Sequence, residues 1–249
     1  MTKSGGSKHQ KRVAAPRNWV IARKQHTFAY RANPGPHGIE ASVPLGILLR
    51  DNLKLGNTAR EIRIILNKKE ILIDGRIIYN PKFPVGLMDV IQIDSINKFY
   101  RVLPDSQHNL KANEMKKPSK ITKACQIMNK STIKGGITQL NLHDGRNIIL
   151  PKEEGIERRY NTKDTLIIEL PSQEIIQHIP FKEGMYAVIK AGRNVGKYGI
   201  IKSFQWRFGP RASTVTITSP EGEEVQTAPE YLFVIGEKSP WWDAKGDGN

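Results

Sequence analysis

Hydrophobic positions in the early part of the chain follow first a helical period and then a strand period. Leucines recur at near-helical spacing between residues 45 and 55, and Gly56 follows as a stop signal. A Thr-Ala-Arg-Glu capping box at residues 58–61 opens a second amphipathic helix. Short β-type runs follow at 71–73, 77–79, 90–93 and 99–102, the first two joined by an Asp-Gly turn. The pattern predicts two helices packed on a small sheet over residues 40–103, with one basic helix face.

The rest of the chain shows only strand patterns. A hairpin is predicted from residues 136–142 and 147–150, and further strands at 164–170, 186–190, 200–204, 214–218 and 231–235. Residues 104–122 are polar and lysine-rich, which indicates a linker or an RNA-facing surface. The predicted fold is therefore α+β, mainly β, and multi-domain. A β-rich central domain would span 104–175, a small barrel 176–240 and a short tail 241–249, in which Trp241 and Trp242 either cap the barrel or dock elsewhere.

Residues 1–39 show neither period and are predicted to form an extended arm. They hold eight basic residues and no acidic one, with aromatic or imidazole rings at Trp19, His26, Phe28 and Tyr30. Rings among cations suit a segment that neutralises phosphates and stacks on bases. The alternative is a tail that only solubilises or targets the protein. The expected RNA contacts in the arm are Lys8, Lys11, Arg12, Arg17, Trp19, Arg23 and Lys24.

Composition narrows the class of protein. Hydrophobic residues make up 38% of the 249, which excludes wholesale disorder, and the net charge of +15 indicates a polyanionic partner. The single cysteine, Cys125, excludes an intramolecular disulfide and a Cys-rich zinc site. No apolar run is long enough to span a bilayer, and the polar N-terminus has no signal-peptide core. We expect a soluble, intracellular protein without a membrane partner.

Candidate catalytic groups are few and poorly placed. His143 and Asp144 are adjacent in a tight turn, so their side chains are expected to point apart, and no third partner is evident. The other histidines lack metal-ligand spacing. Gly192, Gly196 and Lys197 approach a phosphate-binding loop, but the spacing is short and a strand follows instead of a helix. We therefore predict no catalytic residue, no metal, no cofactor and no small-molecule substrate.

Two segments resemble known RNA-binding modules. Residues 58–63, 71–76 and 84–91 resemble the alpha-L motif, which implies that its basic face grips structured RNA. The glycine-rich loop between the strands at 186–190 and 200–204 resembles a KOW motif in an SH3-like barrel. Alternatives are a solvated helix face and a simple tight hairpin, and the nearby Trp206 is either a base-stacking platform or a barrel edge. The implied contacts are Arg50, Lys54, Arg60, Arg63, Lys68, Lys69, Arg76, Arg193 and Lys197.

The order of these modules resembles one family as a whole. A basic arm, an alpha-L module, a β-rich middle and a KOW-bearing barrel are typical of the e-type S-four ribosomal proteins of archaea and eukaryotes, and the short tail favours the archaeal branch. The resemblance implies a non-enzymatic constituent of the small ribosomal subunit, in the cytoplasm, that binds ribosomal RNA and neighbouring ribosomal proteins and supports assembly and translation. Two alternatives are an RNA-modifying enzyme with an alpha-L module and a KOW-containing transcription or translation factor.

Overall fold

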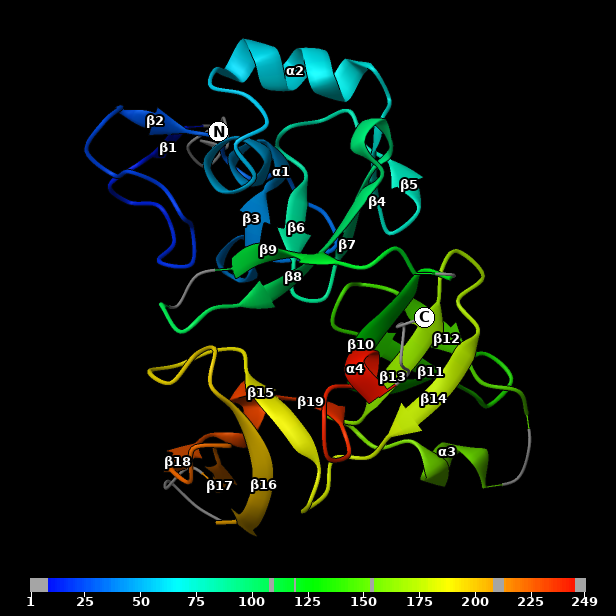
Figure 1. The fold of residues 1–249 in the computed structure, drawn as a ribbon. Helices are drawn as coiled ribbons and strands as arrows, with labels where there is room; N and C mark the ends of the chain where they lie inside the picture. Colours follow the sequence, from blue (N-terminus) through cyan, green and yellow to red (C-terminus); the bar gives the residue numbers. More distant parts are fainter. Residues whose placement is uncertain (1–8, 108–109, 119, 153–154, 208–212, 245–249) are drawn as a thin grey trace, which may run out of the picture. The chain divides into compact units, whose positions relative to one another are not determined.

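The chain forms two compact units. The structure is a computed structural model that describes residues 9–107, 110–118, 120–152, 155–207 and 213–244. Unit 1 comprises residues 1–103 and 109–115, and unit 2 comprises residues 104–108 and 116–249. Both are built mostly from antiparallel strands with a few short helices (Figure 1). The prediction of a mainly β, multi-domain chain is confirmed at this level.

Unit 1 combines two helical segments with small sheets. Its helical elements are α1 (Leu45–Ile47), which continues as the π-helix η2 (Leu48–Asn52), and α2 (Ala59–Asn67), with 3-10 turns η1 (Ile39–Ala41) and η3 (Asp94–Ile96). One sheet pairs β3 (Ser42–Pro44) with β6 (Pro84–Gly86). A larger, five-stranded sheet has the order β5-β4-β7-β8-β9. Its strands are β4 (Ile71–Ile73), β5 (Arg76–Ile77), β7 (Val90–Ile93), β8 (Lys98–Pro104) and β9 (Leu110–Met115).

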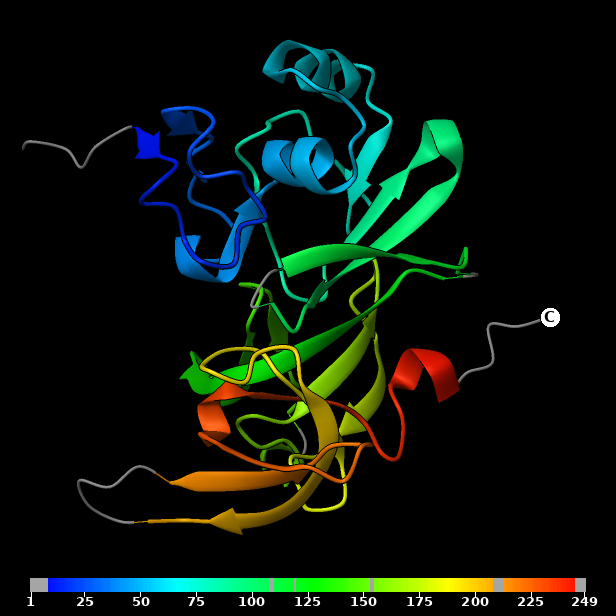
Figure 2. The same ribbon diagram turned by 60° about the vertical axis from the view of Figure 1, so that its left-hand side comes forward.

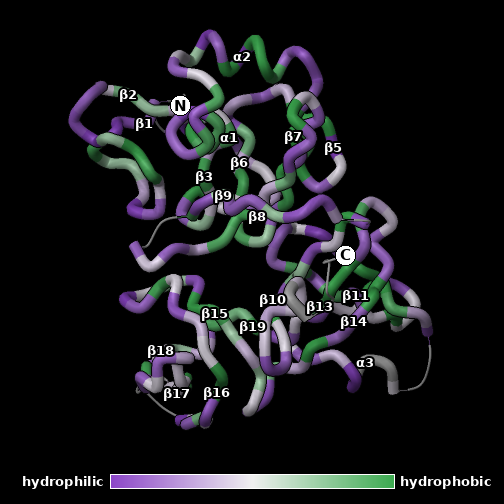
Figure 3. The backbone as a smooth tube through the Cα atoms, in the orientation of Figure 1, coloured by the Kyte–Doolittle hydropathy of each residue, from purple (hydrophilic) through white to green (hydrophobic). Residues whose placement is uncertain are grey.

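The core of unit 1 lies where the helices meet the sheet. Figures 1 and 2 show α1 and α2 side by side, and the tube of α2 alternates between hydrophilic and hydrophobic residues in Figure 3. Ile62 and Leu66 of α2 are fully buried, as are Leu45 and Leu49. The two predicted helices are therefore confirmed. The leucine spacing was only approximately helical because the chain widens into a π turn, in which the amide of Leu53 donates to the carbonyl five residues earlier.

The segment predicted as an extended arm has little regular structure but packs onto the rest of unit 1. Only β1 (Gln10–Lys11) and β2 (Phe28–Ala29) pair within it. The side chain of Trp19 is 2% exposed, and its indole N–H donates to the carbonyl of Ser42 at 2.7 Å. The buried His37 contacts Asp89, with 3.0 Å between Nε2 and Oδ1. These contacts fix the described part of the arm to β3 and to the turn between β6 and β7.

Unit 2 contains two five-stranded antiparallel sheets. The first has the order β12-β11-β10-β13-β14. Its strands are β10 (Thr122–Ile133), β11 (Ile137–Leu142), β12 (Asn147–Ile149), β13 (Thr165–Glu169) and β14 (Ile175–Ile179). One face buries a cluster that includes Cys125, Ile127, Leu140, Leu166 and Ile168. The short helix α3 (Ile156–Arg159) lies in the connection between β12 and β13.

The second sheet of unit 2 has the order β18-β17-β16-β15-β19. Its strands are β15 (Tyr186–Ile189), β16 (Tyr198–Gln205), β17 (Thr214–Thr218), β18 (Glu224–Thr227) and β19 (Leu232–Gly236). A 3-10 turn, η4 (Pro229–Tyr231), precedes β19, and α4 (Trp241–Ala244) follows it with the Trp241 side chain buried. The predicted hairpin on either side of the glycine-rich loop is confirmed by the pairing of β15 with β16.

Within the described residues, the strands that the sequence did not predict are β1, β2, β3, β6, β9, β10, β14 and β18. β9 lies inside the region predicted as a linker, and β14 follows a predicted strand directly. The longest strand, β10, escaped detection because its buried half includes Lys123 and Gln126, so polar and apolar residues do not alternate. Both polar side chains have partners in the fold, which are described below.

Candidate nucleic-acid interface

The start of α2 is fixed by the predicted capping box. The Thr58 side chain accepts a hydrogen bond from the Glu61 amide at 3.2 Å, and the Glu61 carboxylate accepts from the Asn57 amide at 2.8 Å. Hydrogen bonds from the Asn57 amide and the Thr58 hydroxyl lower the pKa of Glu61. The helix therefore begins at a defined residue, and this sets which side chains face outward.

The outer face of α2 and the turns beside it present basic side chains to solvent. Arg60 and Arg63 are exposed one turn apart on the helix, whereas Ile62 and Leu66 are buried. The other predicted contacts in this part of unit 1 that are also exposed are Lys54, Lys68, Lys69 and Arg76. We call these six residues the α2 basic face.

Arg50 is the exception among the residues predicted for this module. Its guanidinium is half-buried, pairs with the Asp51 carboxylate at 2.8 Å, and lies 6.0 Å from the centre of the Tyr30 ring. The hydrogen bond to Asp51 raises the pKa of Arg50. Asp51 lies on the same segment η2, so it is the contact of Arg50 with the Tyr30 ring that links this segment to the arm.

The arm residues divide into an exposed group and a structural group. Lys11, Arg17 and Lys24 are exposed. Arg23 donates to the carbonyls of Ala15 at 2.7 Å and Pro16 at 2.9 Å, so it fixes the path of the arm.

Two further arm residues were predicted to contact RNA: Arg12, which is buried, and Lys8, which the structure does not describe. Arg12 is 2% exposed, with its guanidinium 3.8 Å from the Asp51 carboxylate. Like Trp19, it is therefore a core side chain of unit 1, not an open surface for a base or a phosphate. Lys8 lies outside the described residues.

In unit 2, the loop between β15 and β16 exposes Arg193. Lys197 pairs with Glu223 at 3.0 Å, which partly neutralises it. Lys190, at the base of the loop, is half-buried and donates to the Gln126 side chain, whose own amide donates to the Leu232 carbonyl at 2.9 Å. Burial, together with the nearby charge of Lys163, lowers the pKa of Lys190 to about 8.

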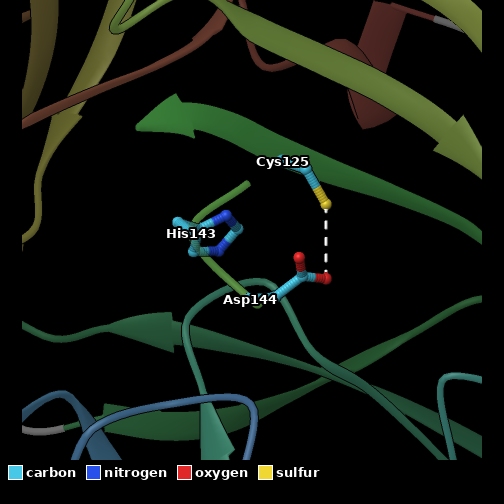
Figure 4. Close-up of side chains that lie close together, drawn as sticks. All are labelled: Cys125, His143 and Asp144. Carbon is cyan, nitrogen blue, oxygen red and sulfur yellow. Dashed lines mark hydrogen bonds between the residues drawn. The ribbon is translucent and has the colours of Figure 1, made fainter. Parts of the chain in front are cut away.

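The His143 and Asp144 pair differs from the prediction. Their side chains do not point apart: ligand-type atoms of both lie within 4.8 Å of each other and of the Cys125 sulfur (Figure 4). The thiol lies 3.6 Å from the Asp144 carboxylate, which also contacts Lys123 at 3.0 Å and Arg146 at 3.2 Å. The sequence gave no sign of this convergence, because Cys125 lies on a strand that the pattern did not reveal.

This cluster is suited to structure, not to metal binding or catalysis. Two cations already balance the Asp144 carboxylate, and Nδ1 of His143 accepts from the Gln126 amide at 3.1 Å. A divalent cation bound here would be repelled by the positive charges of those two side chains. Burial alone would raise the pKa of Asp144, but the charges of Lys123, His143 and Arg146 outweigh it and lower that pKa. The result is a buried carboxylate that stays ionised and paired.

Comparison with known proteins places the chain in a family. The family model described as "Ribosomal family S4e" matches residues 96–175, and the "RS4NT (NUC023) domain" model matches residues 4–40. The protein named small ribosomal subunit protein eS4 of Desulfurococcus amylolyticus is 41% identical over 96% of both chains. That of Methanocaldococcus jannaschii is 42% identical over 96% of this chain and 98% of its own. The chain belongs to the S4e family of ribosomal proteins.

A solved structure supports the same assignment. The crystal structure of the 30S ribosomal protein S4e from Thermoplasma acidophilum has a TM-score of 0.66 and 30% identity, and covers 79% of this chain and 96% of its own. Membership of the S4e family also decides against the RNA-modifying enzyme and the transcription factor, because S4e proteins are structural, non-enzymatic components of the ribosome. Within the described residues, no helix is long and apolar enough to cross a membrane.

Proposed function

We propose that this chain is a structural constituent of the small ribosomal subunit that binds ribosomal RNA and supports subunit assembly and translation in the cytoplasm. The observation that carries the proposal is the match, along 96% of the chain, to proteins named small ribosomal subunit protein eS4. The charge supports it, since a net +15 suits a phosphate backbone. Its neighbours in the subunit would be ribosomal RNA and other ribosomal proteins.

We propose the exposed basic residues, together with the half-buried Lys197, as the RNA interface. In unit 1 they are the α2 basic face and the exposed arm residues, and in unit 2 they are at the loop between β15 and β16. Arg12, Trp19, Arg23 and Arg50 act indirectly, because they hold the arm in place. Lys8 is also proposed as an RNA contact in the arm, from the sequence alone. The direct contacts are Lys11, Arg17, Lys24, Lys54, Arg60, Arg63, Lys68, Lys69, Arg76, Arg193 and Lys197.

The finer module assignments belong to the same proposal. The pair of helical segments, the capping box and the β4–β5 hairpin suit an alpha-L module over residues 40–103. The β15–β16 hairpin, with left-handed glycines at 192 and 196, suits a KOW motif in an SH3-like barrel over 176–240. Residues 1–39 would form the arm, 104–175 the β-rich central domain and 241–249 the tail. The exception is β9, which lies within 104–175 but pairs with β8 in the sheet of unit 1. Each module would place a separate basic surface on the RNA.

Salt-dependent binding to small-subunit ribosomal RNA tests the proposal. A protein that neutralises six or more phosphates loses about three or more orders of magnitude in affinity between 50 and 200 mM salt. The full chain should show such a steep dependence with small-subunit RNA and weaker binding to large-subunit RNA as the control. Equal affinity for both RNAs, or a shallow salt dependence, would contradict the proposed interface.

A further inference from the structure

Three aromatic rings from two segments of unit 2 form a row beside the end of β16. Phe181, just after β14, lies 5.0 Å from Phe204 of β16 between ring centres. Phe204 in turn stacks on Trp206, with centres 5.6 Å apart and planes only 12° from parallel. Because Phe204 and Trp206 are two residues apart on an extended chain, they emerge on the same face. We call Phe181, Phe204 and Trp206 the aromatic row.

The outer end of the row is open to solvent. Trp206 remains 57% exposed, although Phe181 and Phe204 are half-buried. A large ring left mostly in water costs hydration free energy, which a partner would recover by covering it. The ring is also held in place from within, since the strand end is fixed by hydrogen bonds from Thr214 to Gln205 at 3.3 Å and from the Arg207 amide to Ser213 at 3.1 Å.

Positive charge lies next to the exposed ring. The Lys163 ammonium is 5.5 Å from the centre of the Trp206 ring. The acid that contacts the row is Glu183, whose carboxylate accepts from the Phe204 amide at 3.1 Å and is therefore already engaged. A flat, pre-stacked ring with an ammonium group over it complements a base with its phosphate.

We propose that the aromatic row holds one unpaired nucleotide of RNA, with its base on Trp206 and its phosphate at Lys163. The inference rests on the proposed function and assigns a specific task to a face of unit 2 outside the basic contacts already named. A protein partner fits less well. A cationic segment would be repelled by Lys163. An apolar segment would gain nothing from the parallel stacking of Phe204 on Trp206.

Tryptophan fluorescence of the full chain, titrated with small-subunit ribosomal RNA, tests the inference with two variants. Trp206→Phe keeps an aromatic face, whereas Trp206→Leu keeps apolar area without one. The fluorescence of Trp206 is obtained as the difference between the wild-type and Trp206→Leu titrations. This subtraction cancels the fluorescence of the other three tryptophans. Melting temperature serves as the folding control, and it should hardly change because the side chain is exposed.

The inference predicts quenching of the Trp206 signal by RNA. It also predicts that Trp206→Leu weakens RNA binding by about 5- to 150-fold and that Trp206→Phe retains most of the affinity. If all three proteins bind RNA equally and the Trp206 signal is unchanged, the inference fails while the proposed function stands. If the wild-type chain does not bind small-subunit RNA at all, both fail. If the signal changes only on adding other small-subunit proteins, the occupant is a protein and the inference is overturned.

Discussion

The Lys123 ammonium lies 3.0 Å from the Asp144 carboxylate, and both side chains are only 1% exposed. This pair joins β10 to the turn between β11 and β12, so it fixes the hairpin against the strand that bridges both halves of the first sheet of unit 2. Arg146 adds a second cation at 3.2 Å. The buried charges therefore belong to the architecture that supports the proposed RNA-binding surfaces.

Removing the negative charge of this pair should destabilise the protein strongly. Asp144→Asn leaves the Lys123 ammonium buried beside a neutral amide, and breaking a buried pair in this way costs about 3–5 kcal/mol. Denaturant unfolding of unit 2, followed by circular dichroism, measures the change. The double variant Lys123→Met with Asp144→Leu is the matched control and should lose much less. A loss below about 1 kcal/mol for Asp144→Asn would contradict the account.

Lys190 should make stability rise with pH above neutrality. Its pKa in the folded protein is about 8 against an ordinary value of 10.5, so the folded state releases this proton before the unfolded state does. Between pH 8 and 10.5 the unfolded chain binds one more proton, and the free energy of unfolding gains on the order of 1 kcal/mol per pH unit from this group.

The difference between wild type and Lys190→Met isolates that contribution from other groups that titrate in the same range. Urea unfolding at half-unit pH steps should show a difference that grows from pH 8 to 10.5 and is constant below pH 7. A difference that does not vary across this range would show that Lys190 is not held in a desolvated position.

Two glycines in left-handed conformations should respond differently to alanine. Gly196 has φ +81°, and a Cβ there would come within 2.3 Å of the backbone carbonyl carbon of Asp105. Gly222 has φ +85° and open space around the same atom. Gly222→Ala should cost only the strain of the conformation, about 1 kcal/mol, whereas Gly196→Ala should cost several. Thermal unfolding of both variants gives the comparison, and equal losses would mean that the loop before β16 is not packed as described.

The α2 basic face should contribute to RNA affinity without contributing to stability. Arg60→Gln and Arg63→Gln remove exposed charges while keeping good helix propensity. Each should weaken binding to small-subunit RNA at low salt and reduce the slope of log affinity against log salt by about one. Lys98→Gln is the control, because Lys98 is already paired with Glu114 at 2.9 Å. If Lys98→Gln and the α2 variants change RNA affinity and the salt slope equally, the α2 basic face faces solvent and does not bind RNA.

The sequence predicted local features well and distant contacts poorly. Helix α2 was predictable because Thr58 and Glu61 are three residues apart and the apolar period is clear. Trp19 was expected to stack on RNA, but it is buried because the Ser42 carbonyl, 23 residues away, accepts its N–H. Strand β10 was hidden because Lys123 and Gln126 are buried polar residues whose partners lie on other elements. Such partners emerge only once the chain is folded.

Sedimentation of a cell lysate through a sucrose gradient, following this chain, tests the central claim most directly. We expect co-migration with the small ribosomal subunit at moderate salt and release only at high salt, because many phosphate contacts hold the protein. A chain that stays at the top of the gradient at both salt concentrations would contradict its assignment as a small-subunit constituent.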